Sequence, residues 1–211
     1  MTIRLTSLLT KKTFLPLFLT QFLGAFNDNA FKLAMLTLIS YFLTTSQTQS
    51  ENYQAIAAAL YILPFFMFSA VAGSLADKYN KASLTRWIKI LEIVLMMLGG
   101  VGLYFGHIMI MMLTLAGMGV HSTFFGPIKY AILPDHLPKK DLMSATALIE
   151  GSTFLAILLG TTLGTLSIGG AKTGTLYAIG LTLGAAISGF LSSWFIPSAP
   201  PSAVDLKLDW H

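Results

Sequence analysis

The residues of this sequence that are best placed to do chemistry are polar side chains within a long apolar stretch near its start. Asp28 and Lys32 are four residues apart, so on a helix they share one face. Gln21 falls on the same face, and Asn27 and Asn29 flank Asp28. Such groups are costly at membrane depth and normally face a bundle interior or a water-filled cavity. The pattern favours a polar stripe that lines a substrate pathway.

A second interpretation of this stripe is purely structural. Asp28 and Lys32 would form an ion pair within their own helix, while Gln21 and Asn29 would hydrogen-bond to neighbouring helices. Four polar groups in register exceed what helix association needs, so we expect these residues, with Asn27, to contact substrate.

The composition indicates which elements must position this stripe. Of the 211 residues, 55% are hydrophobic and only 10% are charged, against about 25% charged residues in a typical soluble domain. A soluble fold and a disordered chain are both excluded by this balance. The absence of Cys excludes a disulfide scaffold, a thiolate metal site and a Cys nucleophile. The chain is therefore predicted to be an all-α, polytopic membrane protein.

Six apolar stretches are long enough to cross a hydrocarbon core of about 30 Å as helices. No alternating ten-residue strands of a barrel are visible. The first stretch is too long and too polar at its centre to be a signal peptide. The predicted spans are Phe14–Leu43, Tyr53–Ala76, Trp87–Gly106, Ile108–Gly126, Leu142–Ile168 and Gly174–Ile196. In the fourth span, Gly126-Pro127 is expected to end or kink the helix.

The basic residues predict the orientation of these spans. Lys32 lies within the first stretch, and Lys172 is the one basic residue in the connections on the opposite side. This asymmetry predicts cytoplasmic termini and accounts for the net charge of +4 without a nucleic-acid partner. The basic residues assigned to the cytoplasmic segments and their flanks are Arg4, Lys11, Lys12, Lys78, Lys81, Arg86, Lys89, Lys129, Lys139, Lys140 and Lys207.

The connection after the second span carries Gly73, then Asp77 and Lys78, then Lys81. This spacing suits a sharp cytoplasmic turn between antiparallel helices, with a carboxylate available to the N-terminus of a neighbouring helix. Asn80 stands where a turn glycine is usual, and we expect it to accept a positive φ. An ordinary basic loop is the alternative interpretation.

Other polar or small residues have structural interpretations. Gly160 and Gly164 form a small-xxx-small step that predicts close helix packing. Glu92 and Glu150 are expected to snorkel or to pair with basic loop residues, and His121 to hydrogen-bond between helices. No catalytic motif, metal-ligand spacing or cofactor-binding motif is present, so the chain is not predicted to be an enzyme.

Four runs resemble the bacterial lysophospholipid transporter family, a branch of the major facilitator superfamily. They are residues 20–32, with the specific run Phe-Asn-Asp-Asn-Ala-Phe-Lys, and residues 73–81, 125–135 and 147–160. The resemblance covers all six spans and implies the N-terminal half of a major facilitator fold, built as two inverted three-helix units. Asp28 matches the family's functional acidic residue on the first helix.

The resemblance implies a function in lipid transport. Lysophosphatidylethanolamine and lysophosphatidylglycerol would cross the bacterial inner membrane by alternating access and be re-acylated by an acyltransferase on the cytoplasmic side. Asp28 would bind the ammonium of a zwitterionic head group and Lys32 its phosphate. The loop at Gly73, Asp77, Lys78 and Lys81 would act as a latch against a missing second half.

The division of the chain follows from the same resemblance. Residues 1–196 would form the six-helix bundle, and residues 197–211, rich in Pro and Ser, a cytoplasmic linker. We expect that this half alone does not transport. Three alternatives remain: the transport module of a fused phospholipid acyltransferase, a major facilitator half for another small molecule, or a six-helix protein that works as a homodimer.

Overall fold

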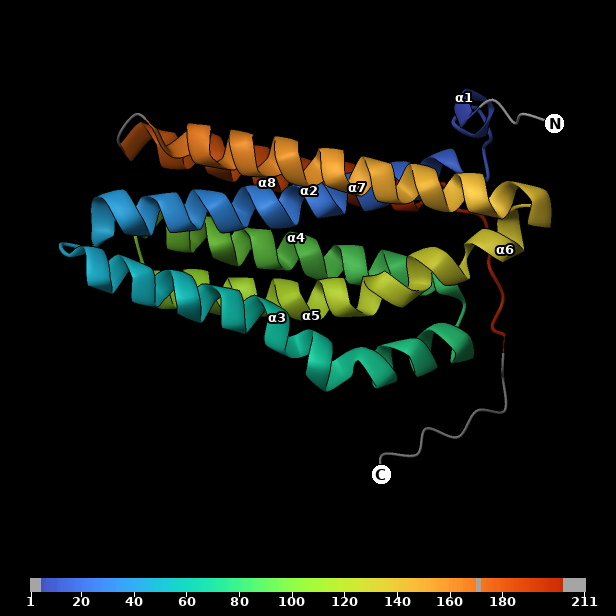
Figure 1. Ribbon diagram of the computed structural model, residues 1–211, viewed down its shortest axis with the longest axis horizontal. Coiled ribbons are helices and arrows are strands. Elements are labelled where there is room, and N and C mark those ends of the chain that lie inside the picture. The colour runs from blue at the N-terminus through green and yellow to red at the C-terminus, as the bar shows by residue number, and fades with distance from the viewer. Residues whose placement is uncertain (1–4, 170–171, 203–211) are drawn as a thin grey trace.

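The structure is a computed structural model that describes residues 5–169 and 172–202. Six long helices lie side by side along one common direction (Figure 1). The short helices α1 and α6 lie at the same end of the bundle, and no strand occurs in the described ranges. The elements are α1 Leu5–Leu8, α2 Leu15–Leu38, a π-helical turn at Ile39–Leu43, α3 Gln47–Lys78, α4 Lys81–Phe105, α5 Ile108–Ala131, α6 Leu133–His136, α7 Lys139–Ile168 and α8 Lys172–Ser193.

The six-helix, all-α prediction is confirmed. Five of the long helices, α3, α4, α5 with α6, α7 and α8, are long and apolar enough to cross a membrane. The remaining long helix, α2, carries the polar stripe, which lowers its hydropathy. Large apolar side chains also cover the outside of the bundle, as at Phe66 with 80% exposure and Phe154 with 72%. Such a surface suits lipid rather than water.

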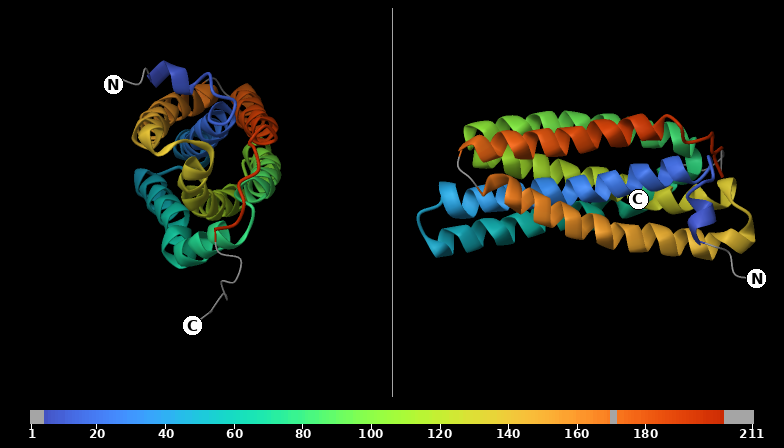
Figure 2. Two further views of the ribbon diagram at one scale, coloured as in Figure 1. Left: turned by 90° about the vertical axis from the view of Figure 1, so that its right-hand side faces the viewer. Right: turned by 90° about the horizontal axis from the view of Figure 1, so that it is seen from above.

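The packing of the helices is reciprocal. The long helices form two groups of three, first α2, α3 and α4, then α5, α7 and α8. The first helix of the first group, α2, packs mainly on α7 and α8. The first helix of the second group, α5, packs mainly on α3 and α4. The third helices of the two groups, α4 and α8, pack against each other. The end-on view in Figure 2 shows this closed arrangement. Two inverted three-helix units related by a two-fold axis give this pattern of contacts, as the sequence predicts.

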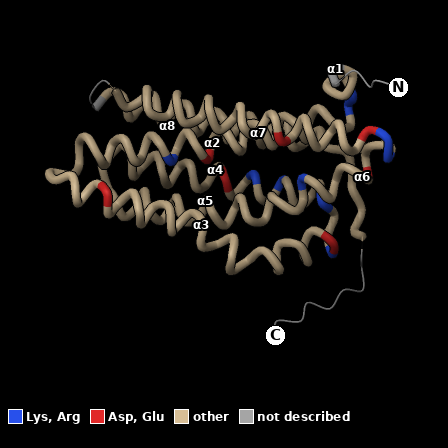
Figure 3. The backbone as a smooth tube through the Cα atoms, in the orientation of Figure 1, with Lys and Arg blue, Asp and Glu red and all other residues tan. Residues whose placement is uncertain are grey.

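Charged residues are concentrated at one end of the bundle. Figure 3 shows Lys and Arg gathered near α1, α6 and the α3–α4 connection, with a few charged residues inside. At this end Lys11 forms an ion pair of 2.5 Å with Asp141 at the start of α7. The opposite end carries the α2–α3, α4–α5 and α7–α8 connections. Arg4 and Lys207, which the sequence assigns to the basic side, lie outside the described residues.

Two helix boundaries differ from the sequence prediction and move basic residues into the bundle. Helix α4 begins at Lys81 rather than at Trp87, so Lys89 lies eight residues, or about 12 Å, inside it. Helix α5 continues through Pro127 to Ala131, so Lys129 belongs to the helix and not to the connection. Pro127 is tolerated because it lies about one turn from the helix end and removes a single backbone hydrogen bond. Assigning Lys129 to a cytoplasmic connection, and Lys89 to the flank of one, was therefore wrong.

The start of α4 explains the first of these differences. The sequence predicts a positive φ at Asn80, and this prediction is wrong. Asn80 has φ −62° and ψ 116°. Its side-chain oxygen accepts hydrogen bonds from the backbone N–H groups of Ala82 (3.1 Å) and Ser83 (3.2 Å). Asn80 is thus the N-cap of α4, and this cap sets the start of the helix.

Candidate functional site

A cavity of about 250 Å³ lies beside the polar stripe of α2. Its lining comes from α2, α3, α5 and α7, with no described residue of α4 or α8. A larger hollow of about 720 Å³ lies between the ends of α2 and α3, but none of the described residues that line it is charged. The smaller cavity is therefore the better candidate for a polar ligand. Its lining residues are Gln21, Gly24, Ala25, Asp28, Asn29, Tyr61, Phe65, His121, Ser122, Phe125, Gly126, Lys129, Thr153 and Ile157.

Asp28 is the buried acidic residue of this cavity, with 6% of its surface exposed. Its Oδ2 accepts hydrogen bonds from the hydroxyls of Tyr61 on α3, at 3.0 Å, and Ser122 on α5. Its Oδ1 is buried and has no hydrogen-bond partner among the described residues. One carboxylate oxygen is thus fixed by the protein, while the other retains its capacity to accept a donor from a ligand.

Lys32 does not pair with Asp28. Its Nζ donates to Asn29 Oδ1 at 3.2 Å and lies 5.2 Å from the centre of the Tyr61 ring. Asn29 in turn donates to the backbone oxygen of Ala25 at 2.8 Å. No ion pair of Lys32 with a described acidic residue is present, and only weak partners hold its ammonium. The interpretation of this stripe as an intrahelical Asp–Lys pair therefore does not fit the geometry.

Gln21 ties α2 to α7 at the edge of the cavity. Its Nε2 donates to Ser152 Oγ at 2.5 Å, and its Oε1 accepts from Thr153 Oγ1 at 3.0 Å. Both ends of the amide are satisfied by the protein, although Gln21 also lines the cavity. Its contacts are those of a helix-packing residue that shapes one wall.

Asn27 faces the opposite side of α2 and does not line the cavity. Its Nδ2 donates at 2.7 Å to Glu92 Oε1, and Glu92 Oε2 lies 2.6 Å from Lys89 Nζ. The Nε2 of His121 is 3.3 Å from the same Glu92 oxygen, but the geometry is not that of a hydrogen bond. These four residues, Asn27, Lys89, Glu92 and His121, form what we call the central cluster, and each has at most 1% exposure. Of the two alternatives expected for Glu92, it does not snorkel toward the loops but pairs with Lys89, a basic residue that the sequence placed at a loop flank.

The glycine step on α7 lies against α2 beneath the cavity. A Cβ built on Gly164 would lie 2.8 Å from the Cα of Ala30, and one on Gly160 would lie 3.2 Å from the Ala30 nitrogen and closer still to the Phe26 oxygen. The two backbones thus approach too closely for any side chain at these positions. This contact holds the polar stripe in register with α7.

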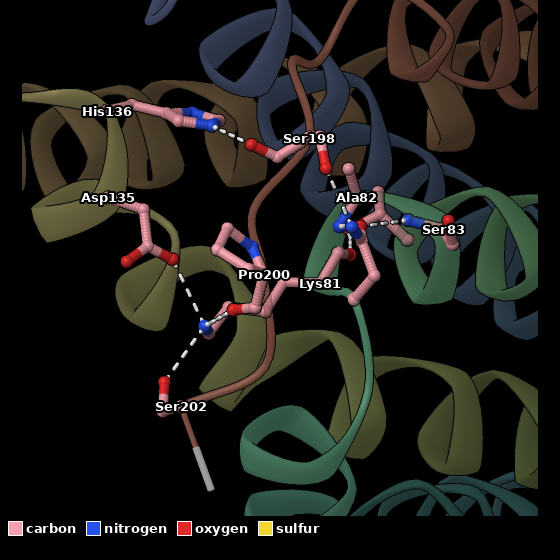
Figure 4. Close-up of polar contacts among 10 residues, drawn as sticks. Lys81, Ala82, Ser83, Asp135, His136, Ser198, Pro200 and Ser202 are labelled. Atoms are coloured by element: carbon pink, nitrogen blue, oxygen red, sulfur yellow. Dashed lines mark hydrogen bonds and ion pairs between the residues drawn. The ribbon is translucent and has the colours of Figure 1, made fainter. Parts of the chain in front are cut away.

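The loop signature is built around Lys81 rather than around Asp77 (Figure 4). Lys81 is 1% exposed, and its Nζ reaches Asp135 Oδ2 at 3.0 Å, the Pro200 oxygen at 2.8 Å and Ser202 Oγ at 3.0 Å. Its backbone N–H donates to the Ala199 oxygen at 3.0 Å. Lys81 therefore joins the start of α4, the end of α6 and the segment after α8.

The segment 197–202 is accordingly docked on the bundle end. The side chain of Asn80 donates to Ser198 Oγ at 2.8 Å, and the N–H of Ser202 donates to the Asp77 oxygen at 2.9 Å. The carboxylate of Asp77 and the ammonium of Lys78 make no hydrogen bond or ion pair with a described residue, and Gly73 has open space where a Cβ would be. The first part of the predicted linker is therefore a defined strap, and residues 203–211 lie outside the described residues.

Comparison with known proteins identifies the family. Residues 17–208 match the family model of the Major Facilitator Superfamily. This chain belongs to the Major Facilitator Superfamily. Its resemblance to the lysophospholipid transporter branch is also confirmed. The chain is 29% identical over 180 residues to the lysophospholipid transporter LplT of Enterobacter sp. (strain 638), a match that covers 85% of this chain and 42% of that protein.

A second relative gives the same result. The lysophospholipid transporter LplT of Escherichia coli (strain SE11) is 32% identical over 144 residues, which is 68% of this chain and 34% of the relative. The chain thus matches only about a third to two fifths of these relatives. Within the superfamily this is a multi-pass membrane chain of a transporter family, not of an enzyme family.

The structure adds several residues that sequence reasoning did not assign to the site. Tyr61, Ser122, His121 and Lys129 line the cavity of this superfamily member beside Asp28. None of them lies near Asp28 in sequence, and the packing of α3 on α5, with α5 beside α2, brings them together. Lys129 carried a usable signal, because it lies two residues after Pro127 in one of the four resembling runs. In the described part of the chain no group of His, Asp and Glu has the arrangement of a metal site.

Proposed function

We propose that this chain is the N-terminal half of a lysophospholipid transporter. Lysophosphatidylethanolamine and lysophosphatidylglycerol are its substrates, and it moves them across the bacterial inner membrane by alternating access. The name of the relatives, lysophospholipid transporter, supports the lipid class, and the cavity beside α2 supports the way in which a head group is held.

The observation that carries this proposal is that Asp28 and Lys32 are one helical turn apart and are not bonded to each other. Asp28 Oδ1 is a buried acceptor without a described partner, and among the described residues the Lys32 ammonium has only an amide oxygen and an aromatic ring as partners. A zwitterionic head group supplies both missing charges, with its ammonium at Asp28 and its phosphate at Lys32. Charge-assisted hydrogen bonds of this kind are stronger than neutral ones.

The rest of the lipid has a place that the surface of the bundle supports. The single acyl chain lies against the apolar helix faces, which expose large side chains such as Phe66 and Phe65 near the cavity-lining part of α3. Alternating access requires the second six-helix half, which closes the cavity from the other side. The loop at Gly73, Asp77, Lys78 and Lys81 latches the two halves. Lys81 anchors the loop within this chain, and the carboxylate of Asp77, which has no partner among the described residues, is available to the second half.

The cellular context follows from the same proposal. Both termini lie in the cytoplasm, where the basic end of the bundle meets an anionic leaflet. Lysophospholipid delivered there is re-acylated by a cytoplasmic acyltransferase, either a separate protein or one fused downstream. The chain needs no cofactor for this function.

Lipid binding tests the proposal directly. The purified chain in nanodiscs, alone and together with the C-terminal half of the Enterobacter relative, is titrated with labelled lysophosphatidylethanolamine, lysophosphatidylglycerol and a sugar. We expect Asp28→Asn to weaken lysophosphatidylethanolamine more than lysophosphatidylglycerol, because only the former carries an ammonium. Lys32→Gln should weaken both, since both carry a phosphate. Losing a hydrogen bond to a charged group costs about 1.5–3 kcal/mol, or roughly ten- to hundredfold in affinity.

Glu51→Gln is the matched control, because Glu51 is an exposed carboxylate at the far end of α3. It should leave the binding of both lipids unchanged. Binding of the sugar but of neither lipid would refute the proposed substrate, and equal losses for the two lipids in Asp28→Asn would refute the role given to Asp28. Transport that appears only with the second half present would support the need for that half.

A further inference from the structure

The central cluster lies at the middle of the bundle, away from both rows of loops, and it touches the wall of the cavity through His121. Lys89 and Glu92 are 0% exposed, His121 is 1% exposed and Asn27 is 0% exposed. His121 also lines the cavity that contains Asp28. A buried ion cluster thus lies directly behind the proposed head-group site, on the side of α2 that faces α4.

The cluster and the cavity are joined by a row of polar contacts. Ser122 Oγ donates to Asp28 and lies 3.5 Å from Nδ1 of its neighbour His121. The other ring nitrogen of His121 is 3.3 Å from Glu92 Oε2. Glu92 in turn contacts Lys89 at 2.6 Å. A change of charge at Asp28 is therefore felt at His121 across one serine side chain.

The buried charges of this region do not balance when His121 is neutral. With Asp28 and Glu92 both ionised, two negative charges face the single positive charge of Lys89, which leaves one negative charge uncompensated. In a low-dielectric interior an uncompensated charge is costly, whereas a paired and hydrogen-bonded set is tolerated. The unpartnered Asp28 Oδ1 and His121 Nε2 are the two places where a compensating positive charge fits.

We propose that His121, held between Glu92 and the cavity, is a proton-binding site whose proton leaves when a cationic head group binds at Asp28. In the empty cavity, the imidazolium of His121 neutralises the cluster. When the substrate ammonium reaches Asp28 Oδ1, it supplies that positive charge, and the proton departs from His121. This inference rests on the proposed function only for the identity of the ammonium compound.

Other charged and titratable groups that face this region do not remove the imbalance. Lys32 on α2 lies over the Tyr61 ring of α3 and is half-buried, not part of the cluster. Lys129 on α5 lies 3.9 Å from Glu150 on α7, so these two offset each other at the cytoplasmic end of the cavity. The Tyr61 hydroxyl is a neutral donor to Asp28. No other charged residue of the described helices contacts the cluster.

Linkage between the two sites has a measurable consequence. If one proton leaves for each ammonium bound, affinity for lysophosphatidylethanolamine rises with pH by up to tenfold per pH unit while His121 is protonated in the empty state. Lysophosphatidylglycerol has no ammonium and displaces no proton. Its affinity therefore does not follow the same pH dependence.

The first experiment measures the proton itself. The full chain in nanodiscs, in weakly buffered solution with a pH indicator at pH 7, is titrated with each lipid. We expect about one proton released per lysophosphatidylethanolamine bound and none for lysophosphatidylglycerol. His121→Gln keeps a hydrogen-bonding side chain but cannot carry the proton, so it should bind without release. His107→Gln is the matched control, because His107 is exposed in the α4–α5 connection.

The second experiment does not depend on lipid binding. In the ligand-free chain with ¹⁵N-labelled histidine, ring nitrogen shifts report whether His121 is protonated. We expect an imidazolium at pH 7 in the wild-type chain and a neutral ring in Asp28→Asn, where the charges of Lys89 and Glu92 already balance. A neutral His121 in the ligand-free wild type would overturn the inference, as would equal proton release in His121→Gln. If His121 is protonated as expected but neither lipid binds, the result counts against the proposed function alone.

Discussion

Lys89 and Glu92 form an ion pair of 2.6 Å within a single helix, and neither side chain is exposed at all. They are three residues apart on α4, so they lie on the same face, which is turned toward α2 and α5. A pair in this position cannot be satisfied by water when one partner is lost. Its presence decides how the centre of the bundle tolerates substitution.

We predict that Lys89→Met and Glu92→Gln each destabilise the chain by about 3–5 kcal/mol, because each leaves a buried charge without its partner. The double variant should lose less than the sum of the two single losses. The measurement is the free energy of unfolding in detergent for the wild type, both single variants and the double variant. Strictly additive losses would show that the two side chains do not stabilise each other.

Close packing of α7 on α2 gives a second prediction. A Cβ at Gly164 would lie 2.8 Å from the Ala30 Cα, so Gly164→Ala must push two backbones apart. We expect a loss of about 1–3 kcal/mol, as for other overpacked positions. The measurement is the midpoint of thermal unfolding in detergent.

Gly151→Ala is the matched control for this substitution. It lies on the same helix, but a Cβ there meets nothing within 4 Å. Because alanine favours a helix over glycine by up to about 1 kcal/mol, this variant should be neutral or slightly more stable. If both variants changed the midpoint equally, helix propensity rather than contact with α2 would account for the effect.

The sequence predicted best those features that depend on a single continuous segment of the chain. The length and apolar content of each stretch predicted six helices, and the spacing of Asp28 and Lys32 placed them on one helix face. Sequence reasoning was less effective between helices, because the approach of Ser122 to Asp28 depends on how α5 packs against α2. No pattern within a single helix carries that information.

The misplaced Lys89 has a different origin. A basic residue near the start of an apolar run resembles a loop flank when the helix is taken to start at the run itself. The cap at Asn80 moves the start of α4 back to Lys81 and carries Lys89 into the bundle. An Asn followed by helix-forming residues is a usable signal for the start of a helix. If Asn80 is taken as this cap rather than as a substitute for the usual turn glycine, the helix starts at Lys81, and Lys89 and Glu92 then lie together inside it.

The strap at 197–202 gives a third prediction. Ala199 is fully buried, and the chain has no native Cys, so Ala199→Cys is a single reporter of strap release. In a background with Lys81→Met, which removes the contacts of the Lys81 ammonium with Asp135 and the strap, maleimide should label this Cys at least tenfold faster. A tenfold ratio corresponds to about 1.4 kcal/mol.

Lys78→Met is the control for strap release, since its ammonium makes no hydrogen bond or ion pair with a described residue. Labelling of Ala199→Cys should then proceed at the rate of the chain with both lysines intact. Equal acceleration by the two lysine substitutions would indicate a general effect of charge on the reagent. An unchanged rate in Lys81→Met would mean that the strap is held by its backbone contacts and not by this side chain.

The orientation of the bundle gives a fourth prediction, and the absence of native Cys again makes it testable with single reporters. Thr10, before α2, lies at the basic end, and Thr45, between the π-helical turn and α3, lies at the opposite end; both are exposed. In intact bacterial spheroplasts, a membrane-impermeant maleimide should label Thr45→Cys and leave Thr10→Cys unlabelled until the membrane is broken. The physical reason is that basic connections are retained on the cytoplasmic side during insertion.

The same pair of reporters tests whether the buried Lys89 and Lys129 count toward this orientation. Removing both from the cytoplasmic set still leaves Lys11, Lys78 and Lys81 near that end of the bundle. We therefore expect Lys89→Met not to alter the labelling of Thr45→Cys, even though it destabilises the folded chain. Substituting Lys11, Lys12 and Lys78 together by Gln should increase labelling of Thr10→Cys, because these residues flank the first two spans. If Lys89→Met inverted the labelling while the triple variant did not, the buried lysine would set the topology before it folds into the bundle.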